Sequence, residues 1–187
     1  NLVNHEKHRP CLDKINSKMV AKLSSRVLVH GDAAVPIVQN MYKIPQSKLR
    51  VIHHGNYAHV LDAIPLGKVQ GSKRFLFFGM IRPYKGVPEL LSAFKALQGQ
   101  ARLQIAGRVK EPALEAEIQT RASDDDRVAL DLSFVSSAEL KRLLAWCHVV
   151  VLPYRDILTS GSLLMALTAG RPVIVPRAGL LPEYAND

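Results

Sequence analysis

The stretch VVVLPYRDILTSGSLLMALTAGRPVIVPRAG, residues 149–179, decides the fold. Its pattern predicts a buried strand over Val149–Leu152, a helix over Ser162–Ala169 and a strand over Val173–Val175. The small turn Thr159-Ser160-Gly161-Ser162 stands at the entrance of this helix. Such a turn directs free backbone N–H groups, backed by the positive end of the helix dipole, at one point. The stretch therefore predicts an anion site that is best suited to phosphate.

An earlier strand, Arg74–Phe78, ends in Gly79 and the cationic loop Arg82-Pro83-Tyr84-Lys85-Gly86. Arg82 would bind a pyrophosphate as a fork and Lys85 as a point charge. We expect these two side chains and the turn Thr159–Ser162 to hold a diphosphate between two strand ends. The alternative interpretation is ordinary: two solvated loop cations and a helix capped by Ser or Thr.

Strands and helices alternate regularly from residue 74 onward, and the strands are almost continuously apolar. This pattern predicts an α/β fold, a Rossmann-like parallel sheet with helices on both faces, preceded by a partial α/β segment. The predicted strands are 74–78, 102–106, 127–132, 149–152 and 173–175. The predicted helices are 87–97, 111–122, 138–146 and 162–169, the third opening with a capping box at Ser136–Glu139.

The first part of the chain has shorter predicted elements and ends in a stretch with weak hydrophobic periodicity. We expect a helix over 12–24, a strand over 26–30, a helix over 33–42 with Asp32 as its N-cap, and a strand over 49–53. The Pro- and Gly-containing stretch that follows reads as a linker. The predicted organisation is an N-terminal domain remnant (1–57), a linker (58–73) and a ligand-binding domain (74–187).

Further candidate residues follow from the rule that ligands lie outside the carboxyl ends of parallel strands. Those near a bound nucleotide or sugar are expected to be Gly79, Gly107, Arg108, Phe134, Val135, Tyr154, Asp156 and Glu183. His53, His54 and Gly55 end the strand before the linker and are candidates for an interdomain cleft. No spacing identifies a nucleophile, a general base or a metal site.

The composition sets limits on partners and location. The 187 residues carry a formal net charge of +9, which favours acidic partners such as nucleotide phosphates or an anionic membrane surface. Basic residues are scattered without interleaved aromatic residues, so nucleic acid is not expected as a partner. The two cysteines belong to no motif, which fits a reducing compartment. The chain begins Asn1-Leu2-Val3, and we expect it to be part of a longer protein.

The runs FLFFGMIRPYKGVPELLSAF (75–94), LQIAGRV (103–109) and LPYRDILTSGSLLMALTAGRPVIVP (152–176) together resemble the donor-binding domain of family 4 glycosyltransferases of the GT-B fold. The upstream run 26–57 resembles the end of that family's N-terminal domain. The resemblance implies a retaining hexosyltransferase that uses a nucleoside-diphosphate sugar and no metal or other cofactor. It also implies that Lys85 binds the donor phosphates.

The sequence departs from this family's pattern at three positions. The family usually has an Arg directly after the strand-end glycine. This chain has Met80 at that position, and Arg82 is expected to take the role of the Arg. The family's paired glutamates fall on Ile157 and Met165. The small turn at Ser160–Ser162 remains, so we expect diphosphate binding with a different sugar selectivity.

The sequence thus predicts a glycosyltransferase that moves a sugar to a glycan or a lipid-linked acceptor, as in polysaccharide biosynthesis. We expect it in the cytoplasm or in peripheral contact with the inner face of the membrane, and we expect this chain alone to be inactive. Two alternatives stay open: a non-catalytic module that binds a nucleotide or nucleotide-sugar, and a nucleotide-sugar epimerase.

Overall fold

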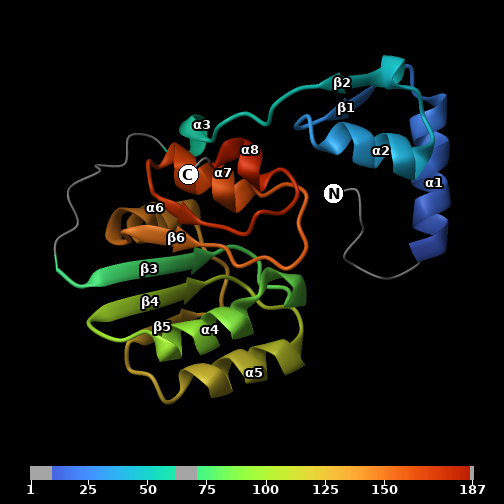
Figure 1. The fold of residues 1–187 in the computed structure, drawn as a ribbon. Helices are drawn as coiled ribbons and strands as arrows, with labels where there is room; N and C mark the ends of the chain where they lie inside the picture. Colours follow the sequence, from blue (N-terminus) through green and yellow to red (C-terminus); the bar gives the residue numbers. More distant parts are fainter. Residues whose placement is uncertain (1–9, 62–70, 186–187) are drawn as a thin grey trace. The chain divides into compact units, whose positions relative to one another are not determined.

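The computed structural model describes residues 10–61 and 71–185, which form two compact units (Figure 1). The first unit contains the chain up to Gly55 together with Ile157–Thr159 and the segment from Arg177 onward. The second contains Asn56–Asp156 and Ser160–Pro176. Residues 62–70 of the predicted linker lie outside the described residues, and the predicted boundaries at 57 and 73 stay predictions.

The second unit is built on a five-stranded parallel sheet with the order β5-β4-β3-β6-β7. Its central strand has Leu76, Phe77 and Phe78 buried in succession, which is typical of a parallel sheet covered on both faces. This arrangement confirms the predicted α/β fold. The strands are β3 (Lys73–Phe78), β4 (Ala101–Ala106), β5 (Val128–Asp131), β6 (Val149–Val151) and β7 (Val173–Ile174).

Helices cover the two faces of this sheet (Figure 1). The helices α4 and α5 lie on one face, where Phe94 of α4 meets Phe75 of β3 edge to face at 6.1 Å between ring centroids. The helices α6 and α7 lie on the other face, and α3 contacts both of them. Their bounds are α3 (Ala58–Leu61), α4 (Val87–Ala96), α5 (Pro112–Ala122), α6 (Ser137–Trp146) and α7 (Gly161–Thr168).

Side chains form hydrogen bonds with the terminal backbone groups at both ends of α6. The Ser136 hydroxyl accepts a hydrogen bond from the Glu139 amide at 3.2 Å, as the capping pattern predicted. At the other end the buried Arg171 donates from Nε to the Leu144 carbonyl (2.6 Å) and from Nη2 to the Ala145 carbonyl (3.1 Å). A cation placed on the last carbonyls of a helix satisfies groups that have no partner within the helix.

The first unit is a smaller α/β assembly around a two-stranded parallel sheet. Its buried core includes Ala21, Val29, Val38 and Leu49 together with the distant Leu180. The elements are α1 (Pro10–Leu23), β1 (Val27–Val29), α2 (Ala34–Tyr42), the short 3-10 helix η1 (Gln46–Lys48), β2 (Leu49–Val51) and α8 (Leu181–Tyr184).

The N-terminus of α2 differs from the sequence prediction. Asp32 does not cap the helix, since its N-cap is Ala33 and no side chain of that residue accepts a hydrogen bond. The carboxylate of Glu183 takes this role: it accepts the amides of Asp32 (3.1 Å) and Ala33 (2.7 Å). A carboxylate at the positive end of a helix is stabilised by the helix dipole, so a residue far along the chain replaces the local cap.

We expect the Glu183→Ala substitution to lower the free energy of unfolding by about 1 kcal/mol, because two amides at the start of α2 lose their acceptor. Urea denaturation followed by circular dichroism measures the effect. Glu183→Gln keeps an acceptor oxygen without the charge and is expected to have a smaller effect. Equal stability of all three proteins would contradict the capping role.

Candidate functional site

The strand order places two chain segments that are distant in sequence side by side. β3 pairs with β4 on one side and with β6 on the other, so the connections from β3 and from β6 leave in opposite directions. In open parallel sheets such a switch point leaves a crevice at the carboxyl ends of the two strands, where ligands bind. Gly79 follows β3 at this point, and Pro153 and Tyr154 follow β6.

Gly79 lies where three segments converge. Its φ of +109° is in the region that favours glycine, and a Cβ atom added there would lie 2.9 Å from Ser162 Oγ and 3.7 Å from Lys85 Nζ. Ser162 donates from its hydroxyl to the Phe78 carbonyl at 3.3 Å. The predicted residues Gly79, Lys85 and Ser162 are therefore brought together around a position where any side chain would intrude.

Gly107, which follows the neighbouring strand β4, lies directly against the backbone of Gly79. A Cβ atom at Gly107 would overlap the carbonyl oxygen of Gly79, and φ there is +151°. The Gly79 amide donates to the Ala106 carbonyl at 3.0 Å. Gly107 thus allows the backbones after β3 and β4 to approach closely, which is a supporting position rather than a ligand contact.

Lys85 ends the short 3-10 helix η2 (Pro83–Lys85) and is half-buried. Its ammonium lies 5.3 Å from the centroid of the Tyr154 ring, within the range of a cation–π interaction. Burial, and secondarily the charge of Arg82, lower the pKa of Lys85 to about 8. Arg82 caps η2 and lies 3.8 Å from the Glu111 carboxylate.

The helix α7 begins at the same switch point, with Ser162 in contact with Phe78 at the end of β3. Ser160 is the N-cap: its hydroxyl accepts the Leu163 amide at 3.1 Å and donates to the Tyr154 hydroxyl at 3.2 Å. Gly161 is exposed and Ser162 is half-buried at the first turn, where amides have no acceptor within the helix. Thr159 directly precedes the cap and belongs to the first unit.

Tyr154 has a more specific place than the sequence indicated. The side chain is buried at 3% exposure, with its ring beside Lys85 and its hydroxyl on Ser160. Burial raises the pKa of its phenol. Tyr154 therefore joins the cationic loop after β3 to the N-cap of α7. No local pattern in the sequence indicates this role.

Other predicted residues lie at strand ends without joining this cluster by a described contact. Arg108 and Asp156 are exposed, and Phe134 is 79% exposed on the loop after β5, next to the half-buried Val135. Tyr57 was not predicted: a Cβ atom added at Gly161 would lie 3.1 Å from its hydroxyl.

Within the first unit, the histidine pair and Glu183 have contacts of their own. The His54 amide donates to the Tyr184 hydroxyl at 3.1 Å, and the His53 ring lies edge-on to the Tyr184 ring at 6.3 Å. The Gly55 carbonyl oxygen lies 2.8 Å from His54 Nδ1 and accepts a hydrogen bond in the tautomer that carries the proton on Nδ1. Glu183, predicted near a bound nucleotide or sugar, accepts hydrogen bonds from the two amides just before α2, and its role at a ligand stays a prediction.

Residues 10–61 and 71–185 contain neither a cluster of metal ligands nor a helix that could span a membrane. No group of three His, Cys, Asp or Glu side chains there could hold a metal ion. No helix in that part of the chain has both the length and the apolar character needed to cross a membrane.

Curated relatives and solved structures resemble this chain. A GDP-mannose:glycolipid 4-beta-D-mannosyltransferase from Xanthomonas campestris pv. campestris is 36% identical over 126 residues, which are 67% of this chain and 36% of the relative. A second protein of that name from the same organism is 39% identical over 104 residues, 55% of this chain and 30% of the relative. The chain thus spans about a third of the length of these relatives.

Solved structures share this fold at low sequence identity. Anabaena HepE in complex with UDP has a TM-score of 0.81 at 17% identity, over 99% of this chain and 54% of that chain. The sucrose-phosphate synthase of Thermosynechococcus elongatus has a TM-score of 0.78 at 18% identity, over 95% of this chain and 47% of that chain. The family model "Glycosyl transferases group 1" matches residues 72–187, more than half of the chain. The chain therefore belongs to the group 1 glycosyltransferases, with the GT-B type of fold.

Proposed function

We propose that the protein transfers a hexose from a nucleoside-diphosphate sugar to a glycan or lipid-linked acceptor, and that the second unit binds the donor diphosphate. The convergence of Lys85, Ser162 and the start of α7 around Gly79 carries this proposal. The name of the Xanthomonas relatives supports a GDP-sugar donor and a glycolipid acceptor, and the UDP complex of HepE supports a diphosphate ligand.

The chemistry follows from where charge grows during the reaction. The bond between the anomeric carbon and the β-phosphate oxygen breaks, and the diphosphate leaves with additional negative charge. In this proposal, Lys85, Arg82 and the amides at the start of α7 stabilise that charge. Groups fixed in advance for a charge that develops in the transition state accelerate the reaction without reorganising. No metal enters this proposal.

The non-catalytic alternative has one observation in its favour. The positions of the family's paired glutamates hold Ile157, which is 8% exposed, and the half-buried Met165. Neither side chain can accept hydrogen bonds from sugar hydroxyls as a carboxylate does. A protein of the relatives' full length that binds a nucleotide-sugar without ever turning it over would favour this alternative.

Retention of the anomeric configuration is carried only by the family resemblance, and the relatives' name specifies a beta linkage. A beta-linked product requires inversion from an alpha-linked donor and retention from a beta-linked donor. Proton NMR of the first product formed by the full-length protein decides the stereochemistry. The present chain is expected to bind donor without turnover, and detectable transfer by the purified chain would contradict that expectation.

Donor binding is tested by calorimetric titration of the chain with GDP, UDP and ADP. We expect one diphosphate to bind best, and its affinity to fall at least tenfold in each of Arg82→Ala and Lys85→Ala because a charge-assisted contact is lost. The matched control is Arg121→Ala, an exposed cation on α5 paired with Glu117. Equal affinities in the control and both site variants would contradict the proposed site.

Donor affinity should also depend on pH through Lys85. The free site holds the pKa of Lys85 at about 8, and a bound diphosphate raises this pKa because it favours the ammonium. The affinity is therefore full below pH 8 and falls as the pH rises above it, by up to tenfold per unit. Titrations between pH 7.5 and 9.5 measure this. Lys85→Arg should remove the decline, since a guanidinium stays charged.

Two substitutions separate the roles of Tyr154. Tyr154→Phe keeps the ring beside Lys85 and removes the hydroxyl from Ser160, so we expect a stability loss of about 1 kcal/mol and a donor affinity within about threefold of the original. Tyr154→Leu removes the aromatic face as well and should weaken the affinity about tenfold. Identical affinities for the two variants would show that the ring does not support Lys85.

A further inference from the structure

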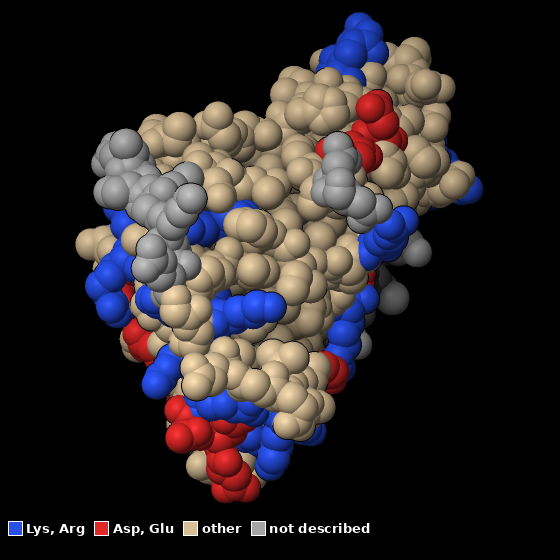
Figure 2. All heavy atoms as spheres, turned by 60° about the vertical axis from the view of Figure 1, so that its left-hand side comes forward, with Lys and Arg blue, Asp and Glu red and all other residues tan. Residues whose placement is uncertain are grey.

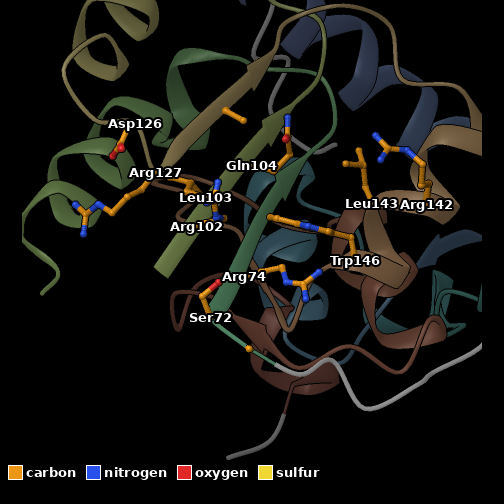
Figure 3. Close-up of a pocket in the computed structure, with 12 residues that line it drawn as sticks. Ser72, Arg74, Arg102, Leu103, Gln104, Asp126, Arg127, Arg142, Leu143 and Trp146 are labelled. Carbon is orange, nitrogen blue, oxygen red and sulfur yellow. The ribbon is translucent and has the colours of Figure 1, made fainter. Parts of the chain in front are cut away.

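A cavity lies in the second unit at the N-terminal ends of the strands. Its volume is about 530 Å³, and its walls include Arg74 of β3, Arg102 and Gln104 of β4, and Trp146 at the end of α6. Figure 3 shows the indole of Trp146 extending from α6 over the strands, next to Arg74. Gly79 is five residues further along β3 than Arg74, about 16 Å at the usual rise per residue. The cavity is therefore separate from the candidate donor site.

Two cations of this cavity are held side by side by the sheet itself. Arg74 and Arg102 are partners in the parallel register of β3 and β4, so they lie on the same face with backbones about 4.8 Å apart. Like charges at adjacent positions of a sheet repel each other. Arg74 is oriented by the Trp146 ring, whose centroid lies 5.6 Å from its guanidinium carbon. A bound anion would relieve the repulsion between the two.

Arg127, Arg142 and Asp126 are further charged residues that line this cavity. Arg127 is paired with Asp125 at 2.7 Å, and Arg142 with Glu139 at 2.6 Å. Figure 3 shows both guanidinium groups away from the indole. Asp126 is the acidic residue that lines the cavity. Arg74 and Arg102 are the two cations of this lining that the sheet register places on one face.

The sheet surface at this cavity is polar where its other face is apolar. Arg102 is exposed and Gln104 is half-buried, whereas the intervening Leu103 and the next residue Ile105 are buried at 1% and 0% exposure. Figure 2 shows the side on which β3 and β4 begin, with Lys and Arg side chains gathered over it. A charged and hydrogen-bonding surface suits a polar anion better than an apolar partner.

We infer that this cavity binds a phosphate group, with Arg74 and Arg102 as the cationic contacts. Two guanidinium forks can bind several phosphate oxygens at once, and the Gln104 amide can donate a further hydrogen bond. The apolar ring of Trp146 forms one wall. A soluble phosphate compound and the headgroup of an anionic lipid share this chemistry, and the experiment separates them.

Trp146 is the single tryptophan of the chain, so its fluorescence reports on this cavity. We would titrate the chain with inorganic pyrophosphate at low salt and follow the Trp146 emission. The titration is repeated in an Arg82→Ala/Lys85→Ala background, which removes binding at the donor site. In parallel, sedimentation with phosphatidylglycerol and with phosphatidylcholine vesicles tests the lipid source.

We expect a saturable change in emission, or selective sedimentation with phosphatidylglycerol, that persists in the double-variant background. Arg74→Gln and Arg102→Gln should each weaken it about tenfold, while the matched control Arg121→Gln on α5 should leave it unchanged. A response to pyrophosphate identifies a soluble ligand, and a response to the vesicles alone identifies a headgroup. No response in either arm, or equal loss in Arg121→Gln, would overturn the inference. Circular dichroism melting curves confirm that each variant is folded.

Discussion

The pairing of β3 with β6 is the constraint on which the candidate site depends. Phe75 is in register with Val149 and Leu76 with Val150, although more than 70 residues separate them in the chain. This pairing requires the chain to cross the sheet through α6, whose last carbonyls are held by the buried Arg171. Because β3 and β6 are adjacent, the loop that carries Lys85 and the helix that begins at Gly161 open onto one crevice.

The crevice combines two ways of providing positive charge. The start of α7 offers oriented amides, whose partial charge is fixed by the backbone. Lys85 offers a full charge that is costly to bury, as its lowered pKa shows. Tyr154 reduces that cost on the protein's side, since its ring faces the ammonium while its hydroxyl meets the N-cap Ser160. The remaining cost of burying the Lys85 charge would favour binding of an anion beside it.

The parts of the fold that could be predicted from sequence are those with a local pattern. The apolar run before Gly79, the Ser160 turn and the Ser136 cap each depend on neighbours within a few residues, and the structure has all three. The cap of α2 could not be predicted in this way. Asp32 fits the local pattern, but the acceptor comes from Glu183, about 150 residues away.

The residues of the candidate site also differ in whether a local sequence pattern could predict them. Lys85 and Ser162 were predicted because each follows a strand or opens a helix, and strand ends of a parallel sheet meet at one edge. Tyr154 beside Lys85, and Tyr57 near Gly161, depend on how segments pack and leave no periodic trace in the sequence. The register that sets Arg74 beside Arg102 is likewise known only once the strands are aligned.

The two proposed sites, at opposite ends of the strands of one sheet, would recognise phosphate in different ways. At the carboxyl ends of the strands, backbone amides and a glycine that leaves no room for a side chain would define where phosphate oxygens fit. At the amino ends, two guanidinium forks on long side chains would hold the phosphate. Interactions of exposed charges are screened by salt, and those of partly buried groups much less. Arg102 is exposed whereas Lys85 is half-buried, so salt should weaken the contribution of Arg102 to binding more than that of Lys85.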